Sequence, residues 1–132
     1  LKLGMSFYSR VSFVNTVKEG TPISYCQTCV APRDTYIATV PVGYADGYNR
    51  LFSNRGRMLI NGRSYLVAGR VCMDQTMLDL GPETDVKVGD QVVLLGQSGD
   101  QVISAYEWAD KLGTITYEIT CQMNQRVTRY YD

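Results

Sequence analysis

Histidine is absent from all 132 positions of this sequence. Any proton transfer by the chain must therefore use tyrosine, lysine, cysteine or a carboxylate. The absence also counts against a metal. Cys26-Gln-Thr-Cys29 has the spacing of half a zinc site, but a structural zinc takes four ligands, and the sequence offers neither a histidine nor a second close cysteine pair. We expect no metal, and we interpret the cysteines as reduced thiols of a cytoplasmic protein.

Net charge and long apolar runs are missing as well. Thirteen basic residues balance thirteen acidic ones, which leaves no overall basic surface for nucleic acid. No apolar run approaches the roughly 20 residues that span a bilayer, so we expect no membrane segment here. The length predicts one domain over residues 1–132. Because the first residue is Leu1 rather than Met, we expect an upstream segment to have been removed.

Short β-prone segments make up most of the chain. Asn61-Gly62 is a strong hairpin signal between the apolar segments 58–60 and 64–67. Runs of apolar and β-branched residues, several of them ended by glycine-containing turns, predict further strands. These lie at residues 6–14, 36–42, 91–96, 114–120 and 125–131.

One segment has the signals of a helix. Ser104 and Glu107 have the spacing of a capping box, and Ile103 and Trp108 that of a hydrophobic staple. Gly113 follows at the expected end of the helix. About ten short strands and one short helix predict a mainly-β fold, either a closed or partly open barrel or a sandwich.

Three polar segments stand out as candidate functional sites. Tyr25 lies in a polar stretch, which taken alone is typical of an ordinary strand tyrosine. In residues 41–50, two glycines flank Tyr44 and Asp46; this suits close backbone approach, or simply a tight turn with a hydrogen bond to the aspartate. Residues 69–76 present Arg, Met, Asp and Gln in quick succession, which suits carboxylate recognition or a β-bulge with surface charges.

In this order and spacing the three segments resemble the C-terminal domain of alanine racemases. The resemblance rests on Tyr25, on Gly43-Tyr44-Ala45-Asp46-Gly47 and on Gly69-Arg70-Val71-Cys72-Met73-Asp74-Gln75. The segments 113–119 and 126–131 are similar to the last strands of the same family. The similarity extends from about residue 5 to residue 131.

The resemblance implies a pyridoxal-phosphate (PLP) enzyme that supplies D-alanine for bacterial peptidoglycan. In this family a TIM barrel, absent from this chain, binds PLP through a Schiff-base lysine. Two chains form a head-to-tail homodimer, so that each β-domain completes the active site on the partner's barrel. The reaction needs two bases, the PLP lysine and a tyrosine. Tyr25 matches that tyrosine and would take the α-proton of L-alanine. The isolated domain, without the lysine, should be inactive.

The resemblance also assigns roles to residues around the site. Met73 matches a residue whose backbone N–H helps to hold the substrate carboxylate, and Asp74 is expected to support that turn. Tyr117 matches a tyrosine near the PLP phosphate that narrows the inner gate together with Tyr25. Four residues match the corridor through which substrate reaches the site: Tyr44, Arg50, Arg70 and Ile115.

Two alternatives stay open at this point. Cys26 follows the tyrosine where many relatives have glycine, and this departure leaves room for a serine racemase of the same family. A non-catalytic β-barrel for binding or dimerisation is the alternative from another functional class.

Overall fold

Two antiparallel sheets and a helix make up the part of the chain that the computed structural model describes, namely residues 6–23, 31, 33–48, 50–53 and 55–112. One sheet has the order β1-β7-β4-β5, with β8 also paired to β7, and the other has the order β2-β3-β6. The elements are β1 (Phe7–Arg10), β2 (Phe13–Val17), β3 (Thr35–Val40), β4 (Arg57–Ile60), β5 (Arg63–Leu66), β6 (Thr76–Gly81), β7 (Gln91–Ser98), β8 (Gln101–Ile103), α1 (Ala105–Leu112) and the 3-10 turns η1 (Tyr44–Asp46) and η2 (Arg50–Phe52).

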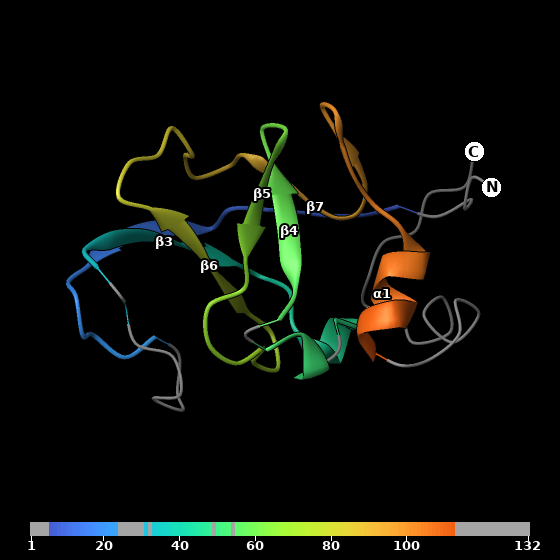
Figure 1. Cartoon of the computed structure of the whole chain (residues 1–132), viewed down its shortest axis with the longest axis horizontal. Coiled ribbons are helices and arrows are strands. Elements are labelled where there is room, and N and C mark those ends of the chain that lie inside the picture. Colours follow the sequence, from blue (N-terminus) through green and yellow to red (C-terminus); the bar gives the residue numbers. More distant parts are fainter. Residues whose placement is uncertain (1–5, 24–30, 32, 49, 54, 113–132) are drawn as a thin grey trace.

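The fold class predicted from the sequence is confirmed: the described residues are mainly β, with a single α-helix. The two sheets meet at a bridge between Val67 and Leu78, and the strands of the described residues do not close into a full barrel. Figure 1 shows α1 at one end of the molecule, next to the 3-10 turns, and the β2-β3-β6 sheet at the other. The strands expected at 114–120 and 125–131 lie outside the described residues.

The strand expected at residues 6–14 is in fact two strands in different sheets. The N–H of Val11 donates to the carbonyl of Asp90 (2.9 Å), whereas the N–H of the next residue, Ser12, donates to that of Thr39 (2.9 Å). The chain therefore leaves the first sheet at Val11 and enters the second at Ser12. The prediction was wrong here because two long-range partners, invisible in the local pattern, divide the segment.

The Asn61-Gly62 hairpin is confirmed. Both residues have positive φ, 53° and 76°, as the tight turn between right-twisted strands requires. The turn sets the β4–β5 register, in which Ile60 pairs with Arg63 and Arg57 with Leu66. The hairpin lies near the centre of the molecule in Figure 1.

Two other strands depart slightly from their predicted limits. The strand expected at 36–42 ends at Val40, where a tight turn follows, closed by the N–H of Val42 on the carbonyl of Val40 (2.8 Å). The strand expected at 91–96 continues to Ser98, because Gly96 adopts a φ of 124° within β7 and the turn comes only at Gly99.

The helix begins as predicted, but its capping box is only half formed. The Ser104 hydroxyl accepts a hydrogen bond from the N–H of Glu107 (3.1 Å), whereas the Glu107 carboxylate binds Arg57 on β4. Ile103 and Trp108, the expected staple, are both buried in the core. Gly113 lies outside the described residues.

The core lies between the sheets and under α1. Its largest cluster draws residues from β3, β4, β6, β7 and α1. The Trp108 indole N–H donates to the carbonyl of Leu94 in β7 (3.1 Å), so the helix is attached to the central strand by a polar contact as well as by apolar packing.

Candidate functional site

Two of the candidate segments lie directly against each other. We call residues 42–48, which follow β3, and residues 69–76, which lead into β6, the loop pair. Strands β3 and β6 are antiparallel neighbours in which Val40 pairs with Thr76, so the end of one strand lies beside the start of the other. Segments about 30 residues apart in sequence thus meet at one edge of the sheet.

Backbone hydrogen bonds join the two halves of the loop pair. The N–H of Tyr44 donates to the carbonyl of Cys72 (3.0 Å), and that of Ala45 to the carbonyl of Met73 (2.9 Å). A β-carbon on Gly43 would overlap the Cys72 carbonyl oxygen and come within 2.7 Å of that of Met73. Glycine is therefore required at position 43 for space.

Local chemistry explains the shape of the first loop. The carboxylate of Asp46 is buried and accepts a hydrogen bond from the N–H of Gly43 (3.1 Å), which closes η1. Gly47 ends the turn with a φ of 103°, a conformation that favours glycine. The aspartate of this segment thus has the turn-forming role that the sequence left open.

A buried threonine anchors the second loop to the first. The Thr76 hydroxyl, fully buried, donates to the carbonyl of Val42 (2.6 Å). Within the second loop, the N–H of Cys72 donates to the carbonyl of Gln75 (3.0 Å). The sequence predicts no role for Thr76, because nothing in the local pattern reveals that its partner lies 34 residues away.

The described candidate residues project from this region into solvent. Tyr44 is 43% exposed and Met73 is 55% exposed, and the guanidinium of Arg50 lies over the Tyr44 ring, 5.4 Å from its centroid. Arg70 and Asp74 are also exposed. The structure therefore brings Tyr44, Arg50 and Met73 together. The remaining candidates lie outside the described residues: Tyr25, Ile115 and Tyr117.

An aromatic cluster supports the loops from behind. The Tyr48 ring stacks on Phe52 (4.6 Å between centroids), and Trp108 meets both edge-on at 5.5 and 5.1 Å. Among the described residues the Tyr48 hydroxyl, which is fully buried, has no hydrogen-bond partner. Burial, and next the negative charge of Glu107, raise the pKa of Tyr48 far above its ordinary value. This tyrosine therefore stays neutral and cannot act as a base.

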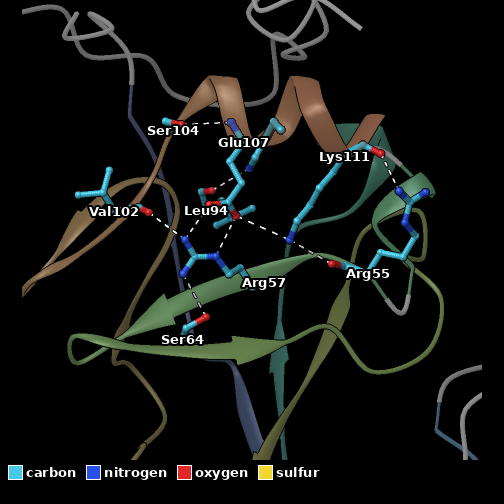
Figure 2. Close-up of polar contacts among 9 residues, drawn as sticks. Arg55, Arg57, Ser64, Leu94, Val102, Ser104, Glu107 and Lys111 are labelled. Carbon is cyan, nitrogen blue, oxygen red and sulfur yellow. Dashed lines mark hydrogen bonds and ion pairs between the residues drawn. The ribbon is translucent and has the colours of Figure 1, made fainter. Parts of the chain in front are cut away.

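A charged network holds α1 against β4 beside this cluster. Figure 2 shows Arg57 reaching from β4 to Glu107 on the helix, with hydrogen bonds of 2.8 and 2.7 Å. Arg55 donates to the carbonyl of Lys111 (2.9 Å), and the Lys111 ammonium donates to the carbonyl of Arg55 (3.2 Å). Hydrogen bonding to Arg57 lowers the pKa of Glu107, and hydrogen bonding to Glu107 raises the pKa of Arg57. The helix is thus fixed at both ends.

The described lysines do not fit a PLP attachment site. A Schiff base forms from a neutral amine, which burial or a second cation favours. Lys18 and Lys87 are instead exposed, and the Lys111 ammonium lies 3.7 Å from the Glu107 carboxylate and donates to the carbonyl of Arg55. Within the described part of the chain no three histidine, cysteine or acidic side chains gather as metal ligands, and no helix there is long and apolar enough to cross a membrane.

Comparison with known families identifies the family of this chain. Residues 4–131 match the family model "Alanine racemase, C-terminal domain". The chain belongs to this family. The match contains both halves of the loop pair.

Individual relatives are similar over nearly the whole chain. The alanine racemase of Cutibacterium acnes is 52% identical over 127 residues, 96% of this chain and 34% of the relative. That of Halothermothrix orenii is 50% identical over 131 residues, 99% of this chain and 35% of the relative. The chain therefore spans about a third of the length of the curated relatives it matches.

Solved structures show the same fold. The alanine racemase of Enterococcus faecalis superposes with a TM-score of 0.90 at 38% identity, over 96% of this chain and 33% of that one. The alanine racemase of Bacillus anthracis with bound L-Ala-P gives a TM-score of 0.87 at 41% identity, over 92% of this chain and 31% of that one.

Proposed function

We propose that this chain is the C-terminal β-domain, residues 1–132, of a PLP-dependent racemase that interconverts L- and D-alanine. The observation that carries the proposal is the loop pair. It brings Tyr44, Arg50 and Met73 together at one exposed edge, as a domain that completes a site on another surface requires. The racemase structure from Bacillus anthracis, which matches 92% of this chain, contains bound L-Ala-P.

In this proposal PLP is attached to a lysine on a TIM barrel outside this chain, in agreement with the setting of the described lysines. The cofactor, when bound, supplies the electron sink that acidifies the α-proton of the amino acid. This domain docks head to tail in a homodimer, so that its loop pair faces the partner's barrel. The enzyme is cytoplasmic and supplies D-alanine for peptidoglycan.

Tyr25 is the proposed base for the L-enantiomer, and the PLP lysine is the base for the D-enantiomer. A tyrosine has an ordinary pKa of about 10, so positive neighbours must favour its phenolate. Met73 offers its backbone N–H to the substrate carboxylate, with Asp74 supporting the turn. Tyr117 narrows the inner gate near the cofactor phosphate. The corridor outside it is lined by Tyr44, Arg50, Arg70 and Ile115.

Loss of α-deuterium from each enantiomer tests this assignment. The assay uses this chain joined to a PLP-binding barrel, either its own or a relative's. We expect Tyr25→Phe to slow abstraction from L-alanine by at least about 100-fold and to spare part of that from D-alanine. The matched control is Tyr106→Phe, which removes the same atom from an exposed tyrosine on α1.

Other results of this assay would change the proposed substrate, mechanism or function. Faster turnover of serine than of alanine would assign the chain to the serine racemases of the same family. If Tyr25→Phe slows loss of α-deuterium equally from L- and D-alanine, Tyr25 is not a base for the L-enantiomer alone. Without the barrel the domain should be inactive, so racemisation by the domain alone contradicts the two-base proposal. If the joined protein racemises neither amino acid, a binding or dimerisation role replaces the catalytic one.

A further inference from the structure

Ser53 joins its own turn to a separate segment at the edge that carries the candidate residues. It follows η2 directly and is half-buried. Its hydroxyl donates to the carbonyl of Arg50 (2.6 Å) and accepts from the N–H of Val71 (2.8 Å). A serine hydroxyl has one proton to donate and lone pairs to accept, so one oxygen atom bonds to its own turn and to residue 71 at once.

We call the hydrogen bond between the Ser53 hydroxyl and the N–H of Val71 the bridge. It connects the η2 turn to residues 69–76, which the backbone bonds of the loop pair do not do. The backbone bonds of Tyr44 and Ala45 connect residues 43–47 to residues 69–76. Arg50 lies on η2, beyond that contact. The N–H of Ser53 also donates to the carbonyl of Arg50 (3.0 Å), so Ser53 and Arg50 form one turn. The Ser53 hydroxyl links that turn to the segment that carries Met73.

Loss of the Ser53 hydroxyl would directly affect the backbone at Val71. Its side chain is buried, and its N–H, which is part-buried, donates to the Ser53 hydroxyl. Removal of that oxygen leaves a sheltered donor without this partner, and the backbone must move or admit water to satisfy it. Because Arg70 and Met73 lie one residue before and two residues after Val71, any such movement shifts both.

We propose that Ser53 is a positioning residue that sets the distance between Arg50 and the segment 70–73. This inference rests on the proposed function, in which these residues line the substrate corridor and hold the substrate carboxylate. A fixed distance keeps the corridor narrow, which favours alanine over longer amino acids. Ser53 touches neither substrate nor cofactor in this role.

The test compares Ser53→Ala, Ser53→Thr and Ser64→Ala in the chain joined to a PLP-binding barrel. Ser64 is the matched control because its exposed hydroxyl, on β5, accepts from Arg57 (3.2 Å) away from the loop pair. We expect Ser53→Ala to raise the KM for alanine about fivefold to tenfold, with kcat within about twofold. Its preference for alanine over 2-aminobutyrate should fall about fivefold. Ser53→Thr, which keeps a hydroxyl, should restore most of both values.

Amide hydrogen exchange at Val71 gives a readout that does not depend on activity. Ser53→Ala should speed exchange there at least about tenfold, while Ser64→Ala leaves it unchanged. Should Ser53→Ala fail to fold, Ser53→Cys replaces it, since a thiol is the weaker hydrogen-bonding group and should give a smaller shift in the same direction.

The outcomes separate this inference from the function on which it rests. If the joined protein is active but Ser53→Ala leaves KM and substrate preference unchanged, the positioning role is wrong and the racemase proposal stands. If kcat alone falls, Ser53 does not act through the corridor. If the unmodified protein is inactive, the proposed function fails and the corridor role fails with it, whereas fast exchange at Val71 would still establish the bridge.

Discussion

The α-carbon of Gly43 lies so close to the carbonyl oxygen of Cys72 that no side chain fits between them. The backbone of Gly43 is extended, with a φ of −153°, so space and not backbone strain excludes other residues. The contact allows the hydrogen bonds from Tyr44 and Ala45 across the loop pair. Two short segments thereby form one surface.

Gly43→Ala should therefore separate the two loops. We expect a loss of about 2–4 kcal/mol in the free energy of unfolding, because the added methyl group meets backbone atoms that cannot rotate away. Urea unfolding of the parent and the variant measures the difference. The control is Gly20→Ala, where nothing lies within 4 Å of the added carbon, so its loss measures only the backbone strain of a φ of 82°, about 1–2 kcal/mol. A Gly43→Ala variant as stable as the parent would mean that crowding is unimportant.

Thr76→Val should weaken the anchor between β6 and the first loop. Valine has nearly the shape of threonine but cannot donate to the carbonyl of Val42. We expect a loss of about 1–2 kcal/mol, since that acceptor lies in the interior. Thr76→Ser keeps the hydroxyl and loses only a methyl group, so it serves as the control. A neutral Thr76→Val would show that the hydroxyl adds nothing to stability.

Tyr48→Phe should be neutral or should stabilise the fold by up to about 1 kcal/mol. The hydroxyl is buried and has no partner among the described residues, and removal of such a group ends its desolvation cost. Tyr48→Ala should instead cost about 3–5 kcal/mol, because the ring packs on Phe52 and Trp108. Thermal unfolding distinguishes the two variants. A marked loss in Tyr48→Phe would reveal a partner for the hydroxyl.

Glu107→Gln should remove an acid-sensitive part of the stability. Arg57 lowers the pKa of Glu107 in the folded state, so the ion pair contributes above the ordinary glutamate pKa of about 4.3 and is lost as the pH falls through the lowered value. At neutral pH we expect the variant to lose about 1–2 kcal/mol, since the pair is partly exposed.

The measurement for Glu107 is urea unfolding from about pH 7 to about pH 3. The difference between the parent and Glu107→Gln should shrink at the acid end. Asp110→Asn is a suitable control, because Asp110 is exposed on the same helix. A difference that stays constant down to the lowest pH would exclude ionisation of Glu107 as its cause.

Much of the local structure follows directly from the sequence. Asn61-Gly62 determines a hairpin because both residues tolerate positive φ. Ser104 determines the start of α1 because its hydroxyl accepts from the N–H three residues later. Tyr25 and the motifs around Tyr44 and Met73, in their order and spacing, indicate the family. The hairpin and helix signals depend on neighbours within a few residues.

The arrangement of the site was decided by tertiary structure. The chain divides at Val11 because the N–H groups of two adjacent residues, Val11 and Ser12, donate to carbonyls in different sheets. Glu107 binds Arg57 rather than completing the capping box, since a charged partner 50 residues away offers the stronger hydrogen bonds. Ser53 was missed because its partner, the N–H of Val71, lies 18 residues away in the sequence. Short-range chemistry determines turns and helix ends, whereas sheet order determines which loops meet.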